Sequence, residues 1–170
     1  MEDTAVKIVQ LPVNEWQAYK TLRLEALKND PQAFASSYQE IALKADSFWQ
    51  SRLSEANQGR GNWLLFAREN QSLLGMIGAF IDEAQKDTAI IISVYVARQA
   101  RRRGIGKKLM AAILQAIKND GIKTARLEVS TEQIAAIQLY KNSGFKAVKT
   151  TQRLMGTGIY HDELLLEMIL

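Results

Sequence analysis

One stretch decides the fold of this chain: Val94-Tyr95-Val96-Ala97-Arg98-Gln99-Ala100-Arg101-Arg102-Arg103-Gly104-Ile105-Gly106-Lys107-Lys108-Leu109. It is typical of a buried strand, an arginine-rich turn and the start of a helix. Backbone N–H groups in the first turn of a helix have no intrahelical partner, and the helix dipole favours an anion there. Gly104 and Gly106 let a ligand approach the backbone, because glycine has no Cβ. With the forked donors of the arginines, this pattern predicts a pyrophosphate site.

Two common phosphate motifs do not fit this stretch. A P-loop needs Ser or Thr after its Gly-Lys pair, and Lys108 follows Gly106-Lys107. The dinucleotide pattern Gly-x-Gly-x-x-Gly fails as well, because Leu109 stands where the third glycine belongs. ATPases and NAD-dependent enzymes are therefore disfavoured.

Composition narrows the class of protein further. The chain has 170 residues, 47% of them apolar and 24% charged, which predicts one domain over residues 1–170. It has no cysteine and a single histidine, so disulfides, a thiolate nucleophile and a Cys- or His-rich metal site are not expected. The apolar run around residues 89–97 is too short to cross a bilayer, and the acidic N-terminus is unlike a signal peptide. We expect no metal, no membrane contact and a cytoplasmic location.

Hydrophobic periodicity predicts a mixed sheet. Residues 88–97 are apolar on both alternating faces, as in a central strand covered from both sides, and residues 124–130 alternate cleanly. A helix over 104–119 joins them, which implies a parallel pair with a right-handed crossover. Further strands are predicted at 6–11, 63–67, 73–81, 145–151 and 163–170. Further helices are predicted after a capping Asn14, over 39–56 with a break, and at 132–141.

The basic residues bunch between Arg98 and Lys108, within a net charge of +4 and an isoelectric point near 9.3. Such a cluster also suits a nucleic-acid surface. No RNA-binding aromatic motif or zinc-finger spacing accompanies it, so we do not expect nucleic acid as the main partner.

A known family pattern fits instead. Arg101-Arg102-Arg103-Gly104-Ile105-Gly106 matches Arg/Gln-x-x-Gly-x-Gly/Ala, and Ala136-Ile137-Gln138-Leu139-Tyr140-Lys141-Asn142-Ser143-Gly144-Phe145 follows at the expected distance. In these two motifs the chain resembles the GNAT superfamily of acetyl-CoA-dependent N-acetyltransferases. The resemblance implies an α/β acyl-CoA N-acyltransferase fold, with about seven strands in a twisted mixed sheet and helices on both faces. Strands 88–97 and 124–130 should part into a V-shaped slot, which admits acetyl-CoA from one side and an amine from the other.

The resemblance also implies roles for individual residues. The backbone of Val94, Tyr95 and Val96 should pair with the pantetheine arm, and an N–H there should polarise the thioester carbonyl. Tyr140 should act as the acid for the departing thiolate. The pyrophosphate should bind Arg101, Arg102, Arg103, Gly104, Ile105, Gly106 and Lys107. The remaining CoA contacts implied are Gln133 and Asn142. The family usually has Gly at the position of Arg102 and often has Asn at the position of Gln133.

The general base is open at this point. Glu128 lies on the polar face of its strand, beside the expected thioester, and is either the base or a structural partner of Arg126 or Arg103. Other candidates are Glu25, Glu40, His161, Asp162 and an ordered water. The segment 23–40 is expected to wall the acceptor pocket, where Glu25 and Glu40 would suit a cationic amine.

The resemblance also implies an activity for the whole chain. We expect it to transfer acetyl groups to a primary amine of a small molecule or peptide, without a covalent enzyme intermediate. The alternative is a module that binds acyl-CoA without turnover. The resemblance also implies a possible homodimer, in which late strands such as 163–170 pair between the two copies.

Overall fold

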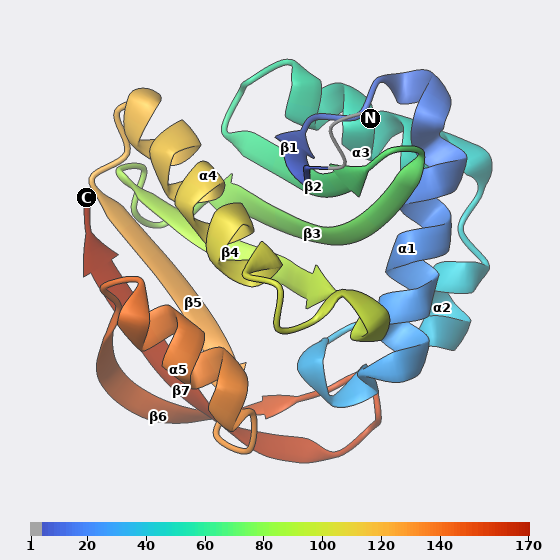
Figure 1. Cartoon of the computed structure of the whole chain (residues 1–170). Coiled ribbons are helices and arrows are strands. Elements are labelled where there is room, and N and C mark those ends of the chain that lie inside the picture. Colours follow the sequence, from blue (N-terminus) through green and yellow to red (C-terminus); the bar gives the residue numbers. More distant parts are fainter. Residues whose placement is uncertain (1–4) are drawn as a thin grey trace.

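Seven strands form one mixed sheet in the computed structural model, which describes residues 5–170 (Figure 1). Their spatial order is β1-β2-β3-β4-β5-β7-β6. The strands are β1 Lys7–Val9, β2 Asn62–Glu69, β3 Ser72–Ile81, β4 Thr88–Val96, β5 Thr124–Ser130, β6 Lys146–Leu154 and β7 Tyr160–Ile169. The helices are α1 Trp16–Asn29, α2 Tyr38–Ala42, α3 Asp46–Asn57, α4 Ile105–Asn119 and α5 Ile134–Asn142. The short 3-10 turns are η1 Val13–Glu15, η2 Pro31–Ala33 and η3 Arg98–Ala100.

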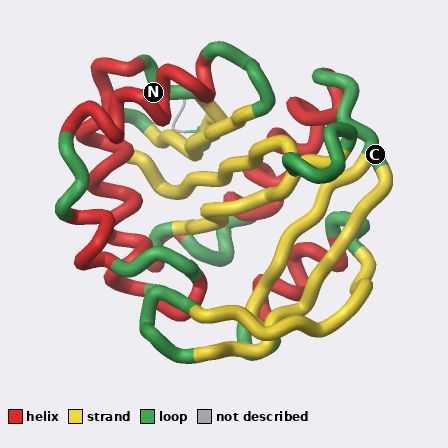
Figure 2. The backbone as a smooth tube through the Cα atoms, turned by 180° about the vertical axis from the view of Figure 1, so that it is seen from behind, coloured by secondary structure: helices red, strands yellow, loops and turns green. Residues whose placement is uncertain are grey.

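Helices cover both faces of the sheet, as predicted (Figures 1 and 2). On one face, Phe66 of β2 meets Tyr19 of α1 edge-on, with ring centroids 5.5 Å apart. On the other face, Trp63 Nε1 donates a 2.7 Å hydrogen bond to Asp120, just after α4. The two β2 residues point to opposite sides because side chains alternate along a strand. The sheet is therefore packed between helices at β2 and β3.

The two central strands part as expected. β4 and β5 pair in parallel only where Thr88–Ile90 lie beside Thr124–Arg126. Beyond Ile90 the β4 backbone bends away, and Ser93 adopts a positive φ of 57°. The register between β3 and β4 shifts at the same level, between Met76 and Gly78. A bulge of this kind adds twist and re-aims the strand, so it opens the sheet on the β5 side.

One predicted helix cap is wrong. Asn14 lies inside η1 and does not cap α1, which has no side-chain hydrogen bond at its start. After Pro12 the chain makes one tight turn, closed by a 3.0 Å hydrogen bond from the Glu15 N–H to the Pro12 carbonyl. This turn carries the chain past Asn14 before α1 begins at Trp16.

The last two strands extend beyond their predicted limits and form a hairpin. β7 pairs with β5 on one side and with β6 on the other. Both of its edges are therefore occupied, and the predicted dimer contact through residues 163–170 has no free edge to use. β6 is the outer strand at this end of the sheet.

Candidate active site

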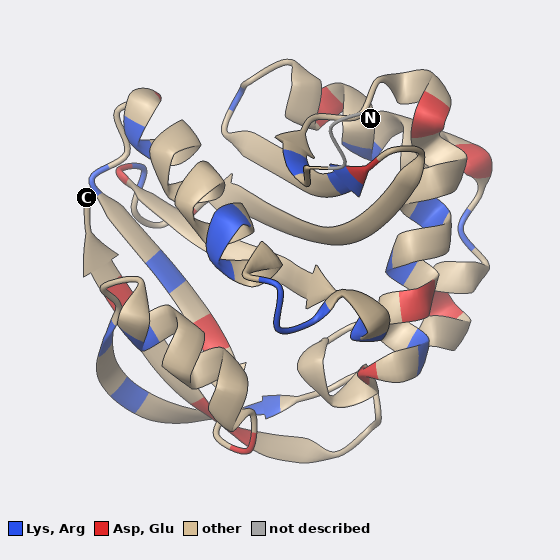
Figure 3. Cartoon of the chain, in the orientation of Figure 1, with Lys and Arg blue, Asp and Glu red and all other residues tan. Residues whose placement is uncertain are grey.

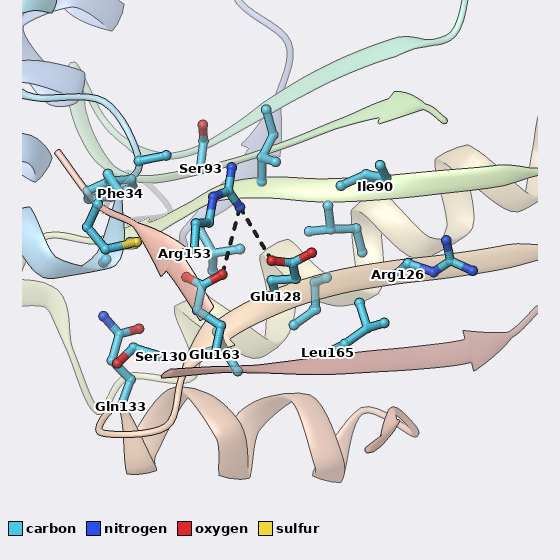
Figure 4. A pocket seen from close by; sticks show the side chains of 18 of the residues that line it. Phe34, Ile90, Ser93, Arg126, Glu128, Ser130, Gln133, Arg153, Glu163 and Leu165 are labelled. Carbon is cyan, nitrogen blue, oxygen red and sulfur yellow. Dashed lines mark ion pairs between the residues drawn. The ribbon is translucent and has the colours of Figure 1, made fainter. Parts of the chain in front are cut away.

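A cavity of about 630 Å³ lies where β4 and β5 separate (Figure 4). One wall is Ile90–Val94 of β4, and the opposite wall is Arg126–Ser130 of β5. Arg23 and residues 33–36, which belong to the segment predicted to wall the acceptor pocket, close one side. The β6–β7 loop reaches across to this side, because the Gly156 N–H donates to the Phe34 carbonyl at 3.1 Å. The slot is thus built from segments far apart in the sequence.

Two carboxylates and one guanidinium meet in the cavity. Arg153 of β6 approaches Glu128 of β5 at 3.7 Å and Glu163 of β7 at 3.8 Å (Figure 4). Arg126, one of the two arginines predicted as a structural partner of Glu128, does not pair with it. Arg126 pairs with Glu167 at 2.8 Å instead. The predicted position of Glu128, facing the slot, is where the structure places it.

Glu163 was missed by sequence reasoning. It is 3% exposed, and burial together with the neighbouring Glu128 raises its pKa to about 7, against the opposing effect of Arg153. Glu163 pairs with Ser130 in the β5–β7 register, so it lies diagonally beside Glu128 on the same face. That register depends on the hairpin and on the central sheet together. In sequence, Glu163 is only an acidic residue at the start of the predicted strand 163–170, and no motif surrounds it.

Tyr140 lies on α5 and lines the same cavity. Its ring packs edge-on against Phe145, with centroids 6.3 Å apart. Burial raises the pKa of the Tyr140 hydroxyl, so the phenol keeps its proton at neutral pH. The group that faces the slot from α5 is therefore a proton and hydrogen-bond donor.

The start of α4 has the backbone shape of an anion cradle. Gly104 precedes the helix in the left-handed conformation, with φ of 74°, and a Cβ there would meet nothing within 4 Å. Arg102 also has a positive φ, of 64°. Gly106 lies against α5, where an added Cβ would come within 3.1 Å of Leu139. The N–H groups of the first turn lack intrahelical partners, and the cradle lies next to the residue that precedes Tyr140.

The basic side chains of this loop divide into two groups. Lys and Arg gather along the connection from β4 into α4 (Figure 3). Arg101 turns back to the protein, where its Nε donates to the Val96 carbonyl at 2.9 Å and its guanidinium pairs with Asp30. Arg103 pairs with Glu69 at 2.6 Å. Arg102 and Lys107 are exposed and make no ion pair with a described residue, so they are the freer cations of the cradle.

The remaining predicted CoA residues lie in different surroundings. Val94 lines the cavity, and β4 beyond Ile90 has no β5 partner, so this part of β4 can pair with an extended ligand, although the Val96 carbonyl already accepts from Arg101. Ile105 is a buried core residue whose side chain does not face the cradle. Gln133 lines the cavity. Asn142 is exposed at the far end of α5, where it accepts a hydrogen bond from Gln138, and it does not line the cavity.

The alternative bases lie outside the cavity. Glu25 accepts a 2.9 Å hydrogen bond from the Tyr95 hydroxyl behind β4. Asp162 accepts a hydrogen bond from Gln152. Neither these acids nor Glu40 and His161 line the cavity, so the predicted role of Glu25 and Glu40 in the acceptor pocket has no structural support.

Two other kinds of feature are absent from residues 5–170. Across residues 5–170, no cluster of three or more His, Asp or Glu side chains is arranged to hold a metal ion. Within that same range, no helix combines the length and apolar character needed to cross a bilayer.

Known proteins carry the same pattern. The acetyltransferase (GNAT) family model matches residues 21–145. Human N-acetyltransferase 8 is 29% identical over 116 residues, which are 65% of this chain and 49% of that protein, so the match spans about half the length of that relative. The ribosomal protein bS18 alanine N-acetyltransferase of Salmonella typhimurium is 25% identical over 130 residues, 75% of this chain and 84% of that protein.

Solved structures share the fold. The ribosomal-protein-alanine N-acetyltransferase of Brucella melitensis superimposes with a TM-score of 0.83 at 21% identity, over 96% of this chain and 99% of that one. The PaiA N-acetyltransferase of Thermoplasma acidophilum, solved in complex with coenzyme A, gives a TM-score of 0.77 at 18% identity, over 98% and 99% of the two chains. The parted central strands, the cradle before α4 and the family match over most of the chain agree, and the chain belongs to the GNAT acetyltransferase family.

Proposed function

We propose that this chain transfers the acetyl group of acetyl-CoA to a primary amine of a small molecule or peptide. One observation carries the proposal: the glycine-lined start of α4 and the unpaired end of β4 open directly beside a cavity that holds Tyr140 and two carboxyl groups. The diphosphate of acetyl-CoA would bind at the α4 N-terminus, where free N–H groups and the dipole favour an anion. Its pantetheine arm would run along β4 as an added strand.

The reaction follows from the groups that face the slot. A primary amine with a pKa of about 10.4 is mostly protonated at pH 7, so it must lose a proton before it attacks. Glu128 and its partner Glu163 take that proton. The amine nitrogen then forms a bond to the thioester carbon, the carbon–sulfur bond breaks, and the electron pair leaves on sulfur. Tyr140 donates a proton to the departing thiolate, and the second proton, which the nitrogen loses as the amide forms, returns to the Tyr140 oxygen.

The carboxyl pair suits this task because one member titrates near neutrality. Burial and the neighbouring Glu128 raise the pKa of Glu163 to about 7, so this carboxyl group can gain or lose a proton near neutral pH. Arg153 holds both in place without neutralising either fully. Direct attack also agrees with the absence of cysteine from the chain, because no thiolate is present to carry the acetyl group.

The test is acetyl transfer itself. Release of free CoA thiol from acetyl-CoA should depend on an added amine, and initial-rate patterns should indicate a ternary complex. Glu128→Gln should lower kcat by about 100-fold, the usual contribution of a general base, while acetyl-CoA still binds. Glu132→Gln, the same change at an exposed glutamate that does not line the cavity, is the control. Binding of acetyl-CoA without turnover on any amine would instead identify a non-catalytic acyl-CoA-binding module.

The cytoplasmic location and a homodimer remain predictions. Cell fractionation and light scattering of the purified chain test them separately, and neither result bears on the chemistry proposed above.

A further inference from the structure

Arg23 is a cation on the cavity wall without a counter-charge. It lies on α1 and lines the cavity. Two other arginines are similarly half-buried, and each is paired: Arg68 with Glu15, and Arg126 with Glu167 at 2.8 Å. No carboxylate of residues 5–170 lies within 4 Å of the Arg23 guanidinium, and its buried Nη1 has no hydrogen-bond partner there. Arg23 thus differs from the other arginines of comparable burial.

The surroundings of Arg23 hold it in place but do not neutralise it. The guanidinium carbon lies 4.6 Å from the centre of the Phe34 ring, a stacked cation–π arrangement. Burial lowers the pKa of Arg23, and the nearby Arg52 acts in the same direction. A desolvated cation without a partner is costly. The fold therefore maintains, at this position, an unbalanced positive charge that an anion would stabilise.

The cavity therefore has groups of opposite charge in two separate parts. The carboxyl groups of Glu128 and Glu163 line one part of it, and these suit an amine. Arg153 is already engaged by both carboxylates, so it is not a free anion-binding group. Arg23 lines the α1 side, next to Phe34 and the segment that Gly156 contacts. A ligand with an amine and an anionic group matches both parts.

We propose that Arg23 binds a carboxylate of the acceptor, so that the preferred acceptors are amines that also carry a carboxylate group. This inference rests on the proposed acetyltransferase function and specifies its substrate class. The carboxylate has two possible sources: the α-carboxylate of a free amino acid, or an acidic side chain next to the N-terminus of a peptide. A charge-assisted pair of this kind contributes roughly 10- to 100-fold in kcat/KM.

Matched acceptor pairs test the inference. The first pair set is free amino acids against their C-terminal amides, and the second is Ala-Glu amide against Ala-Gln amide. In the wild type, one of the two sets should show roughly a 10- to 100-fold higher kcat/KM for the acceptor with the carboxylate. The set that does so identifies the source of the carboxylate. Arg23→Gln should abolish the preference, by lowering kcat/KM for the carboxylate member alone. Arg23→Lys should keep part of it.

The control is Arg68→Gln, which removes the same charge from a half-buried arginine outside the cavity and should leave the preference intact. The inference is wrong if the wild type treats both members of every pair alike, or if Arg23→Gln lowers both members equally. Calorimetry on the CoA-saturated protein separates the two proposals. Carboxylate probes that bind the wild type but not Arg23→Gln, without turnover, would overturn the proposed transfer and support the anion site.

Discussion

In the proposed reaction, three side chains determine how a proton leaves the acceptor. Glu128, Arg153 and Glu163 come from three adjacent strands and meet in one cavity. Glu163 is buried and its pKa lies well above its ordinary value of 4.5, whereas Arg153 is partly exposed and holds the pair. A carboxyl group that titrates near the working pH is the kind of base that proton transfer favours.

The first prediction concerns pH. Because the pKa of Glu163 is raised to about 7, the pair gains its proton as the pH falls through 7, and the rate should fall with it. The profile of kcat/KM against pH should therefore have an acid limb near pH 7. Glu163→Gln should remove or displace that limb, whereas Glu167→Gln, on the same strand, should retain it. A limb that stays at the same pH in Glu163→Gln would rule out its part in proton transfer.

The second prediction concerns the leaving group. Tyr140→Phe removes the only hydroxyl of α5 that faces the cavity and should lower kcat by about 100-fold. Binding of acetyl-CoA should change little, since the cradle lies on α4. Phe145→Leu, which alters the edge-on ring contact of Tyr140 and keeps the hydroxyl, is the matched control. Activity within a few-fold of the wild type in Tyr140→Phe would exclude the acid role.

At the scale of elements, the turn into α4 combines tight backbone geometry with positive charge. Arg102 occupies a left-handed conformation that costs a non-glycine residue about 1–2 kcal/mol. Arg102→Gly should therefore raise the free energy of unfolding by about 1 kcal/mol, which is roughly 2–4 °C in Tm for a chain of this size. Gln99→Gly, in the ordinary backbone of η3, should lower Tm. A lower Tm in Arg102→Gly would show that its side chain, not its backbone, determines stability here.

Elements with strong periodicity are the ones the sequence predicts best. β5 begins and ends at the predicted residues, and α4 differs by one residue, because their apolar patterns are long and regular. The predicted cap at Asn14 was wrong because a 3-10 turn begins after Pro12, and the spacing of apolar residues does not indicate such a turn. Glu163 could not be identified because its neighbours Glu128 and Arg153 reach it only through the pairing of β5, β6 and β7.

At the scale of the whole molecule, the two halves of the slot have different origins. The half proposed to bind acetyl-CoA follows one continuous stretch, from β4 through the turn into α4, so its motif can be recognised in the sequence. The acceptor half joins α1 and the loop after it to the β6–β7 loop, through the hydrogen bond from Gly156 to Phe34. Contacts between such distant segments leave no local pattern.

A fourth prediction tests that long-range contact. A Cβ on Gly156 would lie 2.3 Å from the Ser36 carbonyl oxygen, so Gly156→Ala must push the two loops apart. The KM for the amine should rise while the affinity for acetyl-CoA stays the same. Ile159→Ala, which shortens an exposed side chain of the same loop, is the control for the loop itself. Equal effects on both ligands would indicate a general loss of structure.

The most direct measurement is calorimetric binding of acetyl-CoA to the wild-type chain and to Gly106→Glu. The variant puts a carboxylate at the start of α4, where the diphosphate should lie, and Gln115→Glu adds the same charge on an exposed turn of the same helix. A diphosphate site at this helix start predicts micromolar binding to the wild type and to Gln115→Glu, and none to a folded Gly106→Glu. Absence of binding to the wild type, or equal binding to all three, would contradict it.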